Sequence, residues 1–131
     1  MAKELTTWKI EGASSDAPFL CVEIADSFLS RFFGLMGRRP LPDGCALFLS
    51  PCSSVHMCFM RFSIDVVYVR REACGEGESE QCVRYRVVKV VPKLWPWLGV
   101  SACLSADAVL ELRAGEAARL GLAPGVILTG E

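Results

Sequence analysis

Short apolar runs, rich in β-branched residues, alternate with turn residues along the whole chain. Such runs are typical of β-strands, and the glycines, prolines and short polar residues between them are typical of turns. The pattern therefore predicts a fold built from many short strands. We expect these strands at Trp8–Ile10, Phe19–Ile24, Cys45–Leu49, Val55–Met60, Ile64–Arg70, Val83–Val91, Val109–Arg113 and Val126–Thr129.

Helical periodicity is confined to two segments. The apolar residues of 27–36 recur at spacings of three and four, and a polar residue that can cap a helix, Asp26 or Ser27, precedes them. We expect one clear helix there. Gly115–Leu120 is predicted to form a helical turn or a second short helix.

The spacing of the strands decides the fold class. Strands follow one another closely and do not alternate with long helices, which favours a sandwich or barrel over a doubly wound sheet. Ile64–Arg70 and Val83–Val91 are joined by an acidic loop, so an antiparallel hairpin is the simplest arrangement for them. We predict a mostly β fold, an antiparallel jelly-roll-like sandwich or barrel with one or two short helices, as a single domain over residues 1–131.

Composition narrows the classes of protein that need consideration. With 131 residues, 52% hydrophobic and 22% charged, the chain can bury a core of its own. The 14 Lys and Arg nearly balance the 15 Asp and Glu and form no basic block, so we expect no nucleic-acid partner. The start lacks a signal-peptide pattern and no apolar run is long enough to span a bilayer, which predicts a cytoplasmic protein without membrane insertion.

Seven cysteines are many for this length, and an odd number cannot all pair within one chain. In a reducing compartment we expect most of them to be reduced and to act as small buried hydrophobic side chains. Cys74 and Cys82 are the exception to consider. They flank the polar loop of the predicted hairpin, where two facing residues can come within disulfide range.

Five motifs occur in a characteristic order: Gly34-Leu35-Met36, the stretch from His56 to Asp65, Pro96-Trp97, Val109-Leu110-Glu111-Leu112 with Ala114-Gly115, and Gly121-Leu122. In this order they resemble the domain of unknown function 192 family, over about residues 20–130. The resemblance implies a compact, jelly-roll-like β domain with short helices, found in bacteria and archaea and sometimes preceded by a signal peptide. No activity is established for the family.

The segment 47–69 is the best candidate for a site, because it contains the only histidine, His56. Strand alternation places His56 on one face with Cys58, and such a pair can generate a thiolate nucleophile. Cys52, His56 and Cys58 have spacings that zinc could accept, but no fourth ligand is evident. We therefore expect no metal site and no cofactor.

Asp65 interrupts an apolar strand, where an ionised carboxylate needs a partner. Arg61, His56, Arg31 or a backbone N–H group could supply it, and the sequence does not choose among them. A structural carboxylate is the main prediction. The alternative is a polar cluster of His56 and Asp65, with Arg61, at the rim of one sheet, where it could contact a small polar ligand.

Trp95 and Trp97 lie in a stretch, Pro92–Gly99, that is predicted to form a loop. We expect the two rings to cover the core, as large apolar rings in loops usually do. The alternative is an aromatic contact surface for a sugar or a peptide.

The sequence alone does not define a biochemical function. The leading hypothesis is a small non-catalytic binding or interaction domain for a small polar ligand or a protein partner, because we find no recognised nucleophile motif and no phosphate-binding loop. The alternative is a small hydrolase or transferase that uses His56, Cys58 and Asp65. Thiol reactivity separates the two, because a catalytic Cys58 would be exposed with a depressed pKa.

Overall fold

The computed structural model describes residues 4–12, 19–25, 40–57, 60–78, 80–97 and 99–130, without the side chains of Glu4 and His56. The helix predicted over 27–36 lies outside these residues. No helix in the described ranges is long and apolar enough to cross a membrane.

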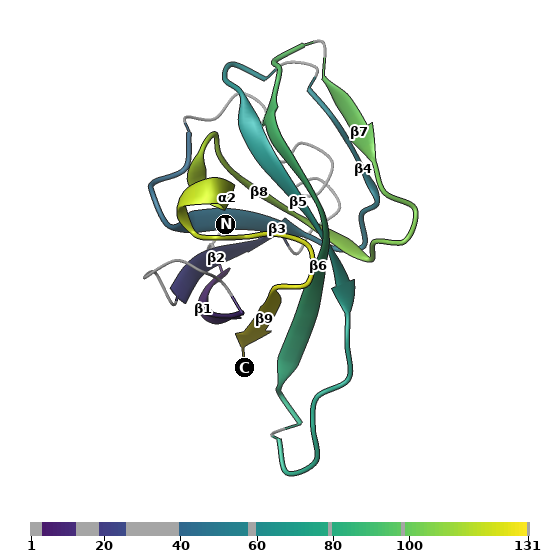
Figure 1. The fold of residues 1–131 in the computed structure, drawn as a ribbon. Coiled ribbons are helices and arrows are strands. Elements are labelled where there is room, and N and C mark those ends of the chain that lie inside the picture. The colour runs from purple at the N-terminus through teal and green to yellow at the C-terminus, as the bar shows by residue number, and fades with distance from the viewer. Residues whose placement is uncertain are drawn as a thin grey trace.

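Seven strands close into a barrel, and a separate pair of strands forms a small second sheet (Figure 1). Around the barrel the order is β1-β2-β3-β8-β5-β6-β9, while β4 pairs with β7. The mostly β fold is confirmed, and of the two predicted forms the barrel is observed. The strands are β1 (Glu4–Glu11), β2 (Phe19–Ala25), β3 (Cys45–Leu49), β4 (Ser54–His56), β5 (Ile64–Arg71), β6 (Val83–Leu94), β7 (Val100–Ala102), β8 (Ala108–Arg113) and β9 (Ile127–Gly130). The short helix α2 covers Glu116–Arg119.

One strand pair departs from the antiparallel arrangement. β2 and β3 run parallel, whereas every other pair in the barrel is antiparallel. A parallel neighbour needs a crossover of a dozen or more residues, and the connection over 26–44 is long enough to provide one. The apolar runs predict the two strands but carry no information on their relative direction.

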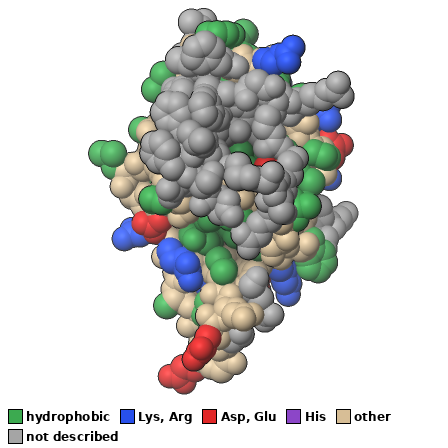
Figure 2. Space-filling view, turned by 180° about the vertical axis from the view of Figure 1, so that it is seen from behind, with side chains coloured by type: hydrophobic (Ala, Val, Ile, Leu, Met, Phe, Trp, Pro, Cys, Tyr) green, Lys and Arg blue, Asp and Glu red, His purple; other side chains and the backbone are tan. Residues whose placement is uncertain are grey.

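The predicted hairpin is confirmed as β5 and β6, which pair antiparallel. Its tip extends away from the barrel and is closed by a Cys74–Cys82 disulfide with a Cα–Cα distance of 6.3 Å. This is the one pair that the sequence singled out. Exposed glutamates lie between the two cysteines, and acidic side chains are visible at this lower end of the molecule in Figure 2.

Two hydrophobic cores lie on opposite faces of the same strands. Val67 and Val69 of β5 belong to the core inside the barrel, whereas Val66 and Tyr68 belong to a second core outside it. Met57 and Val55 of β4 belong to this second core. Because successive side chains of a strand point to opposite faces and both faces of β5 are covered, its buried part is apolar except at Asp65.

The strand expected over Val55–Met60 is shorter than predicted. It ends at His56 and pairs with β7. Met57 leaves the strand because its carbonyl accepts hydrogen bonds from the N–H groups of Met60 and Trp97. β4 and β5 therefore belong to different sheets.

Candidate functional site

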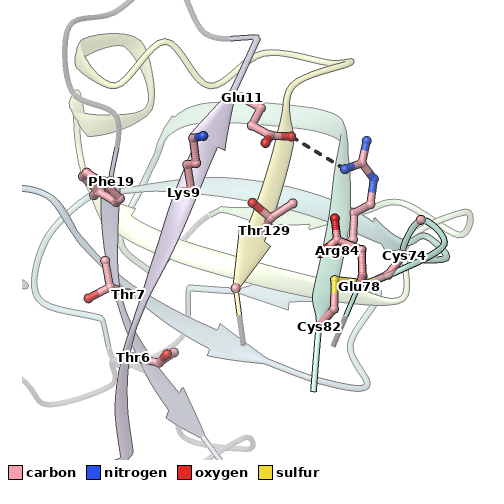
Figure 3. A pocket seen from close by; sticks show the side chains of 12 residues that line it. Thr6, Thr7, Lys9, Glu11, Phe19, Cys74, Glu78, Cys82, Arg84 and Thr129 are labelled. Carbon is pink, nitrogen blue, oxygen red and sulfur yellow. Dashed lines mark ion pairs between the residues drawn. A yellow bond between two sulfur atoms is a disulfide. The ribbon is translucent and has the colours of Figure 1, made fainter. Parts of the chain in front are cut away.

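A groove of about 500 Å³ lies over the outer face of β1, β9 and β6, beside the disulfide-closed hairpin tip (Figure 3). Its lining is mostly polar and comes from both ends of the chain. The residues that line it are Thr6, Thr7, Lys9, Glu11, Phe19, Cys74, Gly75, Glu78, Cys82, Arg84, Thr129 and Gly130.

Four of these residues form one row across four neighbouring strands. Lys9 of β1 is paired in register with Phe19 of β2 and with Thr129 of β9, and Thr129 is paired in turn with Arg84 of β6. The residues next to them in sequence, such as Trp8, belong to the core inside the barrel. Strand alternation therefore points the whole row outwards, and Figure 3 shows Thr129 between Lys9 and Arg84.

Arg84 is held between two carboxylates. Its Nη1 lies 3.6 Å from Oε2 of Glu11, and its Nε lies 3.5 Å from Oε2 of Glu72. Arg86 also donates a hydrogen bond to Glu72, and this bond, with the charges of Arg86 and Arg84, lowers the pKa of Glu72. Lys9, in contrast, makes no ion pair with any residue that the structure describes. Lys9 is thus the groove cation available to a ligand.

The floor of the groove rests on a rigid aromatic cluster. The Trp8 ring contacts Phe48 edge-on, with centroids 5.1 Å apart, and stacks on Tyr85 at 5.5 Å. Gly130, which lines the groove, lies directly against the Trp8 ring. The row of Phe19, Lys9, Thr129 and Arg84 therefore lies on a well-packed part of the barrel.

The Asp65 side chain is buried, and its carboxylate accepts hydrogen bonds from three backbone N–H groups. Lys93 donates to Oδ1 at 3.0 Å, while Gly115 and Ala117 donate to Oδ2 at 3.0 and 2.9 Å. The carboxylate thereby ties β5 to β6 and to the start of α2. Of the partners considered from the sequence, backbone N–H groups supply these contacts, as a structural carboxylate requires.

A model of the family described as Uncharacterized ACR, DUF192, matches residues 9–130. The chain belongs to the DUF192 family. No curated protein matches it in sequence.

Two solved structures share the fold of this DUF192 chain. One, from Sinorhizobium meliloti 1021 and described as a "putative transcription regulator", is 19% identical over 99% of this chain and 96% of its own, with a TM-score of 0.76. The other, a protein of unknown function from Novosphingobium aromaticivorans DSM 12444, is 21% identical over 98% of this chain and 92% of its own, with a TM-score of 0.68. At these identities the likeness establishes the fold alone.

The other predicted residues that the structure describes do not line the groove. His56 lies in β4, opposite Val100 of β7, and its side chain and Cys58 lie outside the described residues. Arg61 is exposed. The hypothesis that His56 and Asp65 lie together assumed that both belong to one sheet. Because β4 does not pair with β5, this assumption no longer holds, and their shared cluster stays a prediction.

The prediction that Trp95 and Trp97 cover the core is wrong. Their side chains are 71% and 58% exposed. The loop turns tightly here, because Gly99 N–H donates to the Trp95 carbonyl and Trp97 adopts a left-handed φ of 67°. The exposed residues Val100 and Leu104 follow in sequence. The sequence could not show this turn, because a non-glycine residue rarely adopts a positive φ.

Sequence reasoning missed two buried carboxylates, Glu111 and Glu116. Glu116 accepts hydrogen bonds from Arg119 Nε at 2.6 Å and from the N–H of Gly44, and the Arg119 contact is the main cause that lowers the pKa of Glu116. A signal for Glu111 was present: like Asp65, it interrupts an apolar strand. For Glu116 the spacing to Arg119 was the local signal, whereas its contact with Gly44 could not be predicted because the two residues are distant in sequence.

Proposed function

We propose that this DUF192 domain is a non-catalytic binding domain that takes a small polar ligand with a carboxylate group in the groove over β1, β9 and β6. The row of Phe19, Lys9, Thr129 and Arg84 carries the proposal. We also propose that residues 1–131 act as one unit.

The donors of the row suit a carboxylate. Neighbouring strands lie about 4.8 Å apart, so the Lys9 ammonium and the Thr129 hydroxyl can reach the same ligand group. Lysine and hydroxyl donors are suited to bind an anion through charge-assisted hydrogen bonds. Arg84 already has Glu11 and Glu72 as partners, which leaves Lys9 as the principal anchor.

The remaining lining residues suggest what else the ligand carries. Glu78 places a carboxylate at the hairpin side of the groove, where a ligand amine would be favoured. Phe19 is 58% exposed at the other end of the row and offers an apolar face. A free amino acid or the end of a short peptide combines these groups, and we take amino acids as the class to test first.

The enzyme alternative receives less support. Both oxygens of Asp65 already accept backbone hydrogen bonds, so Asp65 is engaged in holding the fold. A nucleic-acid partner also has little support, because the charge is balanced at 14 against 15 and the hairpin tip is acidic. The cytoplasmic location stays a prediction, and the Cys74–Cys82 disulfide is more typical of oxidising compartments.

The test is a titration of the ¹⁵N-labelled protein with L-phenylalanine, followed by amide chemical shifts. We expect saturable shifts at Lys9 and Thr129, and no such shifts with phenylalaninamide, which lacks the carboxylate. Lys9→Met should weaken binding about tenfold, which corresponds to the loss of one charge-assisted hydrogen bond. Arg70→Met, an exposed cation outside the groove, should leave the affinity unchanged.

Two results would contradict the proposal. Equal affinity of the wild-type protein and Lys9→Met would mean that the groove cation does not hold the ligand. Absence of saturable shifts at the groove with every amino acid would mean that this ligand class is wrong.

A second candidate function is suggested by the exposed apolar side chains of Trp95, Trp97, Val100 and Leu104. The four residues are close in sequence, and an exposed apolar patch often marks a contact surface for a protein or peptide. Quenching of tryptophan fluorescence by acrylamide, with and without a candidate peptide, tests it. If the peptide protects the tryptophans from quenching and this protection is lost in Trp95→Ala, the result supports this surface. If a peptide binds without changing the quenching, the result argues against it.

A further inference from the structure

Two free cysteines lie side by side on the outer face of the barrel. Cys21 of β2 and Cys45 of β3 are register partners in the parallel pair, and both are partly buried and not in a disulfide. Leu20 and Val22 belong to the core inside the barrel, so Cys21 between them points outwards. Cys45 contacts the second, outer core. The two thiols therefore share one face.

The spacing of the strands favours a metal ion between the two sulfurs over a direct disulfide bond. In a parallel pair the side chains of register partners are nearly parallel, so their Cβ atoms lie about one strand spacing, or about 4.8 Å, apart. A disulfide needs Cβ atoms about 3.5–4.5 Å apart, so direct bonding would require the strands to approach. A metal ion between the sulfurs adds two bonds of about 2.3 Å each and spans the wider gap without that movement.

We propose that Cys21 and Cys45 form a two-thiolate site for a soft, thiophilic metal ion of the copper(I) class. Thiolate sulfur selects soft ions such as copper(I). On binding, each thiol releases its proton to solvent as its sulfur bonds the metal, and no electron is transferred. The proposal does not depend on the function proposed for the groove.

The surroundings of the pair agree with this assignment. Burial, the hydrogen bond with Cys21 and the charges of Cys21, Glu116 and Glu23 together raise the pKa of Cys45 to about 11. In the absence of metal the Cys45 thiol is therefore held protonated. A bound cation reverses this preference, since it deprotonates the thiols and is attracted by the same two carboxylates.

In the described part of the chain, the sulfurs of Cys21 and Cys45 are the two ligands available to the metal ion. Within this part of the chain, no three side chains of His, Cys, Asp or Glu gather at one point. Such a site differs from the four-ligand zinc site that the sequence argued against, because copper(I) accepts two ligands whereas structural zinc takes four.

The test is an anaerobic titration with copper(I) in competition with bicinchoninate, on the protein with its Cys74–Cys82 disulfide intact. We expect wild type to withhold one equivalent of copper(I) from the chelator. Cys21→Ser and Cys45→Ser should each weaken this binding at least a hundredfold. Cys103→Ser, which removes another partly buried thiol, is the matched control and should retain wild-type binding.

Thermal melts of each variant establish that it is folded, and Cys21→Ala replaces Cys21→Ser if the hydroxyl is not tolerated. Wild-type affinity in a folded Cys21 or Cys45 variant would overturn the assignment. So would a wild-type protein that withholds no copper(I). If glutathione disulfide oxidises the pair to a second disulfide while copper(I) does not bind, the pair is a redox pair and the metal site is rejected.

Discussion

The indole ring of Trp8 lies against the backbone of Gly130, so closely that this position has no space for a side chain. A Cβ added at Gly130 would fall inside contact distance of the ring, 2.7 Å from Nε1. The floor of the groove and the core of the barrel therefore meet at this contact.

We expect Gly130→Ala to destabilise the protein by about 1–3 kcal/mol, because the ring is packed between Phe48 and Tyr85 and cannot retreat freely. Urea unfolding measures the loss. The matched control is Gly75→Ala at the hairpin tip, where a Cβ would lie 3.9 Å from its nearest neighbour and should cost little. Equal losses in the two variants would mean that the Trp8 contact is not responsible.

Asp65→Asn should cost on the order of 3 kcal/mol. It replaces a charged acceptor of three backbone hydrogen bonds by an amide that accepts through one oxygen only. The control is Asp43→Asn, which weakens an exposed ion pair with Arg113 and should cost less than about 1 kcal/mol. Free energies of unfolding from denaturant titration compare the two, and a small loss for Asp65→Asn would show that these bonds do not hold α2 in place.

A double-mutant cycle with His56→Ala and Asp65→Ala tests whether the two residues act together. β4 and β5 belong to different sheets, and the Asp65 oxygens already have backbone donors. We therefore expect additive losses of stability. A coupling energy above about 0.5 kcal/mol would instead support the shared polar cluster that the sequence suggested.

Glu116 should make stability depend on acid pH. The hydrogen bond from Arg119 and that from the Gly44 N–H lower the pKa of Glu116 below its ordinary value of 4.5. The stabilisation that Glu116 contributes is fully present above the pKa that Glu116 has in the unfolded chain. It is lost as the pH falls through the lower pKa that Glu116 has in the folded protein. Glu116→Gln should therefore lower stability at pH 7 and flatten the acid limb of the stability profile. Glu76→Gln, an exposed change at the hairpin tip, should leave the profile unchanged.

The cysteines should separate into two bonded and five free. The chain has seven, and two form the Cys74–Cys82 disulfide, which leaves five cysteines, of which the four in the described part of the chain are free. Counting thiols in denatured, unreduced protein should give five, and reduction beforehand should give seven. A count of seven without reduction would mean that the disulfide does not form, and a count of three would mean a second one.

The strands could be read from the chain because a strand is a local pattern. Runs such as Cys45–Leu49 were predicted with their observed bounds, and the hairpin of β5 and β6 followed from two runs with a short polar loop between them. The acidic loop also indicated Cys74 and Cys82 as a pair, since residues facing across a hairpin are close whatever surrounds them.

The site could not be read in the same way. The sequence showed that Asp65 needs a partner, but its three donors come from residues 93, 115 and 117, on segments distant in sequence. The row of Phe19, Lys9, Thr129 and Arg84 joins both ends of the chain to its middle. None of these residues stands out locally, because exposed polar residues on a strand are ordinary.

The sequence by itself thus indicated most of the strands, the mostly β fold and the family, and it named Cys74 and Cys82 as the two cysteines to consider as a pair. Each of these depends on residues close together in the chain or on the order of short motifs. Tertiary structure alone decided which strands become neighbours when the barrel closes, that β2 and β3 run parallel, and which outward side chains fall into register. Side-chain alternation fixes the face of a residue relative to its own strand, whereas only the pairing of distant strands fixes what lies beside it.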